Sequence, residues 1–123
     1  MRMWMVDPTC MCNQHLLGEH VEIHSFVGTI NKTRKLYEGY RGLVDVKKLW
    51  SRHEEIVEEM TRRGMNHNSP LPGIKPIVFE STVNVEESKK ELMRRCELCR
   101  ARFEKKERKE SENEKQLLRA LLE

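Results

Sequence analysis

Apolar residues recur at helical spacing in three stretches of the chain, and these stretches predict three main helices. The first runs from Asn13, a residue type that often caps helices, to about Asn31. Its apolar side chains fall into one narrow sector at about 100° per residue, with His20 beside them. This sector indicates a helix that faces a core through Leu16, Ile23, Val27 and Ile30.

The second predicted helix begins near Asp45, a possible N-cap residue, and ends at Gly64. Arg62 and Arg63 lie in its last turn, where cations suit the negative end of the helix dipole. We expect most of the acidic side chains between the apolar positions to face solvent. The inward positions are Leu49, Ile56, Val57 and Met60, and the acidic ones are Glu54, Glu55, Glu58 and Glu59.

The third stretch, residues 85–123, reads as one long charged helix. Its apolar seam consists of Val85, Leu92, Cys96, Cys99 and Phe103. The segment Glu104–Gln116 has no apolar residue, so a solvated helix and disorder both remain open there. Four leucines then return an apolar patch that could dock on the core or mediate self-association through this helix: Leu117, Leu118, Leu121 and Leu122.

Two segments lack helical periodicity. Residues 1–12 read as an extended N-terminal arm with a turn at Asp7-Pro8, and residues 65–84 read as an irregular, proline-rich connection with a short extended piece at 77–79. The predicted fold is therefore all-α, a single compact domain spanning 1–123. It comprises the arm (1–12), the first two helices (13–64), the connection (65–84) and the charged C-terminal helix (85–123).

Composition narrows the class of protein. The 123 residues are 35% charged and 37% hydrophobic, which fits one folded core with a polar exterior and excludes a large multi-domain enzyme. Neither a membrane span nor a signal peptide is evident, so we expect an intracellular protein without membrane contact. Lys and Arg number 23 against 20 Asp and Glu, so the chain carries no strongly basic tail.

A strip of ionisable residues flanks the apolar sector of the first helix. His15, Glu19, Glu22 and Phe26 follow at i, i+4, i+7 and i+11, which places them on one side of a helix. Two carboxylates one turn apart can tune each other for proton exchange near neutral pH. The same strip is equally compatible with the polar flank of an amphipathic helix.

Several segments together resemble the pyrimidine-dimer DNA glycosylases, the small phage-type endonuclease V enzymes. The resemblance covers roughly the first 66 residues and is most specific in the first 30. It is carried by Arg2, Gln14-His15-Leu16, Glu19 and Glu22, by Leu49, Arg52, Glu55 and Ile56, and by the helix end Arg63-Gly64-Met65-Asn66.

The resemblance implies a DNA glycosylase and abasic-site lyase that acts on double-stranded DNA containing damaged or modified bases. Its nucleophile would be the α-amine of the first residue, which maps onto Met1, 21 positions before Glu22. Glu22 would be the acid/base, and the bulky Arg2 favours retention of Met1. Gln14, His15 and Arg2 would contact DNA, with His15 binding a phosphate or orienting Glu22. No cofactor is implied, and the host would be a microbial or phage-infected cell.

The chain also departs from the family pattern. Val21 and Ser25 occupy positions where the family usually has DNA-gripping arginines, and the family's aromatic, basic C-terminal tail is absent. Lys32, Arg34 and Lys35 are candidate substitutes for DNA binding. The alternative function is a non-catalytic helical module that kept the fold and binds DNA or a protein.

The cysteines and histidines suggest a further alternative, a zinc-stabilised DNA-binding domain. Cys10, Cys12, Cys96 and Cys99 could form a four-thiolate zinc site, although the last two also suit a core seam. His20 and His24, at i and i+4, are either ligands or partly buried imidazoles. His53 and His67 form no recognisable constellation in the sequence.

Overall fold

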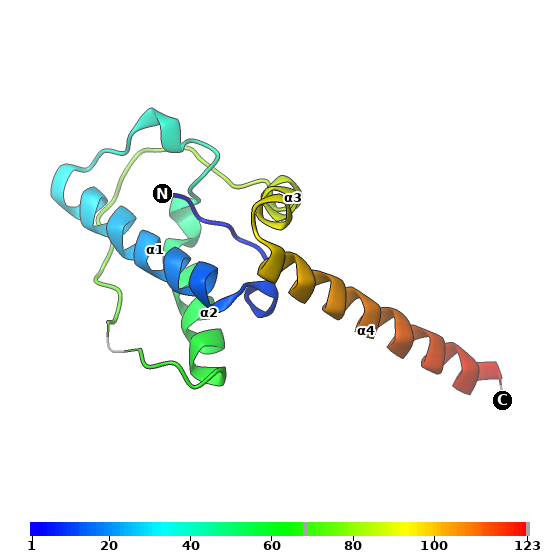
Figure 1. Cartoon of the computed structure of the whole chain (residues 1–123). Helices are drawn as coiled ribbons and strands as arrows, with labels where there is room; N and C mark the ends of the chain where they lie inside the picture. The colour runs from blue at the N-terminus through cyan, green and yellow to red at the C-terminus, as the bar shows by residue number, and fades with distance from the viewer. Residues whose placement is uncertain (68, 123) are drawn as a thin grey trace.

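A computed structural model describes residues 1–67 and 69–122. These residues form four α-helices and no strand, which confirms the all-α prediction. Figure 1 shows α1 and α2 side by side, the arm and α3 next to them, and the long α4 leading away to the C-terminus. The helices are α1 (Asn13–Thr33), α2 (Leu49–Arg62), α3 (Val85–Arg95) and α4 (Glu97–Leu122), with short 3-10 helices at Pro8–Cys10, Glu38–Tyr40 and Val46–Lys48.

Helix α1 buries the sector predicted from its periodicity. Leu16, Ile23, Val27 and Ile30 are all fully buried in the core. The helix begins one residue earlier than expected, because the cap is Cys12 rather than Asn13. The backbone of Cys12 is extended, and its side chain accepts a hydrogen bond from the amide of His15.

Helix α2 also follows its predicted pattern, with a different start. Leu49, Ile56 and Met60 are buried as predicted, whereas Val57 is only partly buried and Glu59, expected among the acidic residues that face water, is buried. Asp45 precedes a 3-10 helix at Val46–Lys48, and this short helix leads directly into α2. The helix ends where Gly64 adopts a left-handed backbone with φ +79°, a conformation that glycine adopts without steric cost.

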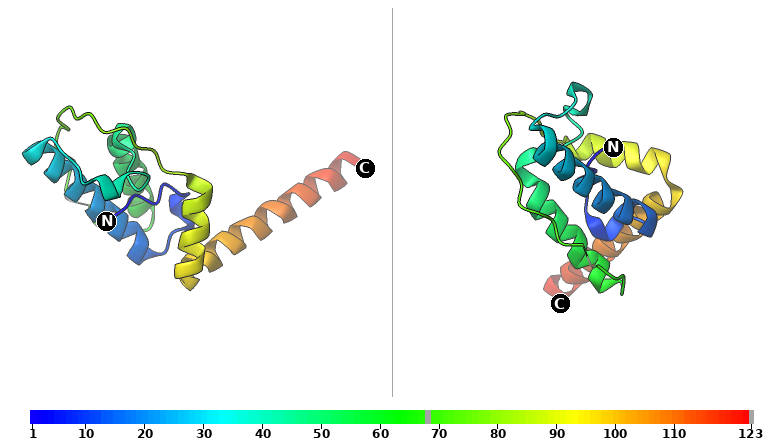
Figure 2. Two further views of the ribbon diagram at one scale, coloured as in Figure 1. Left: turned by 90° about the horizontal axis from the view of Figure 1, so that it is seen from above. Right: turned by 90° about the vertical axis from the view of Figure 1, so that its left-hand side faces the viewer.

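The predicted helix over residues 85–123 is divided at Cys96, whose backbone is extended with φ −132° and ψ 111°. The Cys96 amide closes α3 by donating to the carbonyl of Leu92. Its sulfur and its carbonyl then accept from the amides of Cys99 and Arg100, in the first turn of α4. Cys96 is therefore the end of one helix and the start of the next, and the chain changes direction there (Figure 2).

Only the first part of α4 contributes to the core. Cys99 and Phe103 are buried, whereas the segment 104–116 is a largely exposed helix, the solvated alternative of the two left open. The four terminal leucines, from Leu117 to Leu122, are also exposed and do not pack on the core. No helix in the described part of the chain is both long and apolar enough to cross a membrane.

The arm lies between α1 and α3, and its apolar side chains are part of the core (Figure 2). Met3, Trp4 and Val6 are buried, and the Met3 amide donates to the carbonyl of Leu43 over 2.7 Å. The hydroxyl of Ser88, on α3, donates to the carbonyl of Trp4 over 2.5 Å. These contacts fix the start of the chain against the loop at Leu43 and against α3. In the connection, residues 77–79 form no strand.

Candidate functional site

The start of the chain lies against Glu22. The backbone amide of Arg2 donates to Oε2 of Glu22 over 3.1 Å. Three covalent bonds separate this amide nitrogen from the α-amine of Met1, so the two nitrogens lie within about 4 Å of each other. Met1 is 47% exposed and Glu22 is half-buried, so solvent and a ligand can reach both residues.

The Arg2 side chain turns toward α3 and stacks on an aromatic ring. Its guanidinium lies 3.9 Å from the centre of the Trp4 ring, and its Nη2 donates to Ser88 Oγ over 3.2 Å. Arg2 Nε is buried without a hydrogen-bond partner among the described residues. Burial and the nearby charge of Arg95 lower the pKa of Arg2. A cation held in this way lacks a full set of protein acceptors and can bind an anion.

A polar pocket adjoins Arg2, between the arm and α3. Arg2, Asn84, Ser88 and Arg95 line it together with two carboxylates, Glu87 and Glu91. Arg95 is ion-paired with Glu91. Guanidinium groups are typical ligands of DNA phosphates, whereas the Ser88 hydroxyl already donates its hydrogen to Trp4. Arg2 is therefore the guanidinium of this pocket that has no ion-pair partner among the described residues, and it lies beside the chain start.

His15 and Gln14 lie away from the Glu22 carboxylate. His15 Nδ1 is 3.2 Å from Cys12 Sγ and 3.7 Å from Cys99 Sγ, and the ring edge meets Trp4. The structure thus brings His15 to sulfur atoms and not to Glu22. Gln14 is exposed in the first turn of α1 and lines a separate pocket with Leu98.

Glu19 belongs to a buried ion pair that the sequence reading did not identify. Its carboxylate accepts from Arg52 of α2, at 2.6 Å from Nε and 3.0 Å from Nη2. Phe26, the last member of the predicted strip, is fully buried in the core. The strip is therefore not one polar face, and its carboxylates bind different partners. Arg52 follows Leu49 by three positions and precedes Ile56 by four, a spacing that signals the buried side of α2.

The candidate basic cluster lies at the far end of α1. Lys32 and Lys35 are exposed, and Arg34 caps the helix with φ +58° while its side chain donates to the carbonyl of Pro76. Ten residues of helix separate Lys32 from Glu22, a rise of about 15 Å. Val21, beside Glu22, is exposed and uncharged. These cations can contact DNA only at some distance from the chain start.

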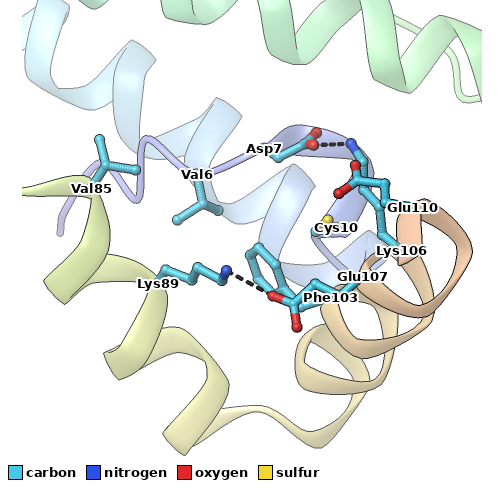
Figure 3. Close-up of a pocket in the computed structure, with 9 residues that line it drawn as sticks. All are labelled: Val6, Asp7, Cys10, Val85, Lys89, Phe103, Lys106, Glu107 and Glu110. Carbon is cyan, nitrogen blue, oxygen red and sulfur yellow. Dashed lines mark hydrogen bonds and ion pairs between the residues drawn. The ribbon is translucent and has the colours of Figure 1, made fainter. Parts of the chain in front are cut away.

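The structure separates Cys10 from the other three cysteines. Cys10 lines a pocket between the arm, α3 and α4, together with the paired residues Lys89 and Glu107 (Figure 3). Burial raises the pKa of the Cys10 thiol. The remaining cysteines converge elsewhere, with His15 in the position that the four-cysteine hypothesis gave to Cys10: Cys12, His15, Cys96 and Cys99.

A second convergence involves the other four histidines. His20 and His24 from α1 meet His53 from α2 and His67 from the connection. The i, i+4 pair was visible in the sequence. Its partners were not, because they come from elements whose packing the sequence does not specify.

Comparison with known proteins places this helical chain in a family. The sequence profile of the family described as pyrimidine dimer DNA glycosylase matches residues 1–72 of the 123-residue chain. The chain belongs to this family. Comparison with curated proteins and with solved structures gives no significant match. Glu22, the arm and both helices of the α1/α2 pair lie inside the matched segment.

Proposed function

We propose that this protein excises damaged or modified bases from double-stranded DNA and then cleaves the abasic strand by β-elimination. The nucleophile is the α-amine of Met1, and Glu22 is the acid/base. Family membership supports the glycosylase part of the proposal. The single observation that carries the assignment of residues is the hydrogen bond from the Arg2 amide to Glu22 Oε2, at 3.1 Å.

A primary amine at the start of a chain suits the reaction because its lone pair can form an imine with a sugar carbon. Its lone pair attacks the sugar C1′, a nitrogen–carbon bond forms, and the glycosidic bond breaks with its electron pair leaving on the base. The sugar ring then opens, with its oxygen taking up a proton, and a Schiff base remains. Loss of a C2′ proton expels the 3′ phosphate, and water finally hydrolyses the imine to release the amine.

Glu22 supplies and removes protons at these steps. The Glu22 carboxylate contacts the Arg2 amide, next to the Met1 amine. In the protonated form, Glu22 can therefore donate a proton to the ring oxygen of a sugar bound at this amine. As a carboxylate it stabilises the cationic sugar and can accept the C2′ proton. Glu19 cannot share this role, because Arg52 engages both of its oxygens in the interior.

Arg2 and the adjoining pocket would hold the phosphate next to the reacting sugar. Stacking on Trp4 and the bond to Ser88 orient the guanidinium without neutralising it. His15, Gln14 and the cations Lys32, Arg34 and Lys35 would add contacts farther along the DNA. Access to C1′ requires a displaced nucleotide, so the bound duplex is kinked or has a flipped base.

The test is covalent trapping with borohydride. Untagged protein is incubated with a duplex that contains an abasic site or a pyrimidine dimer, borohydride is added, and the adduct is located by peptide mass spectrometry. The expected adduct is on the Met1 amine. Glu22→Gln should lower strand cleavage far more than it lowers DNA binding.

Two matched controls make the result specific. Residues added before Met1 should abolish trapping, whereas the same residues added after Glu123 should not, since α4 carries the C-terminus away from the site (Figure 1). Glu58→Gln changes an exposed glutamate on α2 and should behave as the parent does. Binding to damaged duplex with no adduct under any condition would instead support the non-catalytic module.

A further inference from the structure

Three sulfur atoms and one imidazole nitrogen converge where α1, α3 and α4 meet. The ligand atoms of Cys12, His15, Cys96 and Cys99 all lie within 4.8 Å of one another. Cys12 Sγ is 3.9 Å from Cys96 Sγ and 3.2 Å from His15 Nδ1, and Cys99 Sγ is 3.7 Å from the same nitrogen. The edges of a tetrahedral zinc site are about 3.8 Å between sulfurs and about 3.5 Å between sulfur and nitrogen, given usual bond lengths. We propose that these four residues bind one Zn²⁺ ion.

The backbone presents the four ligands in two similar pairs. Cys12 caps α1 and Cys96 precedes the first residue of α4, and both have an extended backbone. Each pair has the spacing C-x-x-H or C-x-x-C, so the second ligand, His15 or Cys99, lies one turn into the helix. The interruption of the helix at Cys96 frees this cysteine from helical geometry, so that its sulfur and that of Cys99 can turn toward one ion.

Backbone amides are already directed at the sulfurs. The amides of His15, Cys99 and Cys12 donate to the sulfurs of Cys12, Cys96 and Cys99, over 3.4, 3.4 and 3.2 Å. A zinc ion with three thiolates and a neutral imidazole carries one net negative charge, and such donors stabilise it. All four cysteines are free thiols, and the 3.9 Å between the sulfurs of Cys12 and Cys96 is far too long for a disulfide.

This ion would join the family-matched segment to the remainder of the chain. Cys12 and His15 lie within residues 1–72, whereas Cys96 and Cys99 lie beyond them. The bound metal would hold the α3–α4 junction against the start of α1, next to the arm. The inference does not depend on the proposed function, because zinc content is measured without DNA.

A second cluster of possible metal ligands consists of four histidines: His20, His24, His53 and His67. Their ligand nitrogens also lie within 4.8 Å of one another. Nε2 of His24 is 3.2 Å from Nε2 of His53. The Nε2 atoms of His20 and His67 are buried without any hydrogen-bond partner among the described residues. Buried polar atoms normally have a hydrogen-bond partner. Two of these nitrogens have none in the described part of the chain and the other two face each other, which is expected where four imidazoles bind one cation.

The outer partner of His53 fits the same interpretation. Its Nδ1 lies 3.0 Å from a carboxylate oxygen of Glu54, which fixes the proton on Nδ1 and leaves the lone pair of Nε2 directed inward. A carboxylate behind an imidazole is a common second partner of metal-ligating histidines. We infer that the four imidazoles bind a divalent cation of the zinc type, for which neutral nitrogen ligands are suitable.

The first experiment measures metal in the full chain, purified without chelators from zinc-supplemented cells. Two zinc ions per chain are expected by native mass spectrometry. Cobalt substitution distinguishes the sites, since only the thiolate site gives an intense sulfur-to-cobalt charge-transfer band. Cys96→Ser should lose that band and one ion, whereas the matched variant Cys10→Ser should keep both. Parent and Cys10→Ser chains that bind no metal and show no thiolate band would overturn the thiolate site.

The histidine site has its own variants. His53→Ala should remove one ion and leave the thiolate band intact. Glu54→Gln retains all four ligands and should lower the affinity for that ion about 10- to 100-fold. If Cys96→Ser or His53→Ala does not fold, cobalt titration of the metal-depleted parent chain decides both sites. A parent chain that takes up only the thiolate-bound ion would overturn the histidine site.

Discussion

Arg52 and Glu19 form a two-pronged ion pair inside the protein. The Nε–Oε2 and Nη2–Oε1 distances are 2.6 and 3.0 Å, and Arg52 is 2% exposed. Arg52 also donates to the carbonyl of Val6 over 2.7 Å. One guanidinium therefore connects α2 to both α1 and the arm.

Loss of Arg52 should be strongly destabilising. Arg52→Met leaves the Glu19 carboxylate buried without its partner, and we expect a decrease of about 3 to 5 kcal/mol in the free energy of unfolding. Urea denaturation measures it. Replacement of Arg108, an exposed arginine on α4, should change this free energy by less than about 0.5 kcal/mol. The double variant Glu19→Leu, Arg52→Met should recover much of the loss, and an equal effect of Arg52→Met and Arg108→Met would contradict this account.

Ser88 positions Arg2 and should influence DNA binding through it. Ser88 Oγ donates to Trp4 and accepts from Arg2 Nη2, so Ser88→Ala removes both hydrogen bonds. A contribution of about 1 kcal/mol corresponds to roughly fivefold weaker binding of abasic duplex. Ser51→Ala, on the exposed side of α2, is the control. Unchanged affinity of a folded Ser88→Ala protein would show that Arg2 does not need this support.

Glu59 should make stability depend on acid pH. Hydrogen bonds from Arg62 and Arg63 lower the pKa of Glu59 below its usual value. A carboxyl group with a lowered pKa in the folded state stabilises the fold above its unfolded pKa, and this contribution disappears as the pH falls through the folded pKa. Stability of the parent should therefore fall more steeply than that of Glu59→Gln below about pH 5. Denaturation midpoints across pH, with Glu58→Gln as control, test this; parallel curves would refute it.

The outer part of α4 should contribute little to stability. Phe103 is the last buried residue of the helix. A chain that ends after Ser111 should unfold within about 0.5 kcal/mol of the parent, as exposed changes usually do. Phe103→Ala should instead cost about 3 to 5 kcal/mol. A comparable loss in the shortened chain would mean that the four terminal leucines contact apolar surface.

Periodicity predicted the helices well and the polar interior poorly. The buried positions of α1 were correct because Leu16, Ile23, Val27 and Ile30 repeat at helical spacing. The break at Cys96 was missed because its neighbours, Arg95 and Glu97, favour helix. A pattern of apolar positions also assigns every charged residue to the surface, so it does not predict that Glu19 and Arg52 are buried.

The candidate sites were likewise predictable within one helix and not between helices. Residues close in sequence, such as His20 and His24, were recognisable from one helix. The pairing of Glu19 with Arg52 joins positions 33 residues apart, and His15 meets Cys99 over 84 residues, in the place that the four-cysteine hypothesis gave to Cys10. Such pairs depend on how helices pack, which local spacing does not encode. The expectation that Met1 lies near Glu22 rests on the family resemblance, and the contact that the structure gives Glu22 is with the Arg2 amide.

The segment that matches the family and the segment that forms the core differ in extent. The family profile ends at residue 72, yet Leu92, Cys99 and Phe103 share one core with the arm residues Met3 and Trp4. A fragment cut at the family boundary would uncover the side of the arm that packs on α3. The family-matched segment is therefore smaller than the core to which it belongs, and the C-terminal helices complete that core.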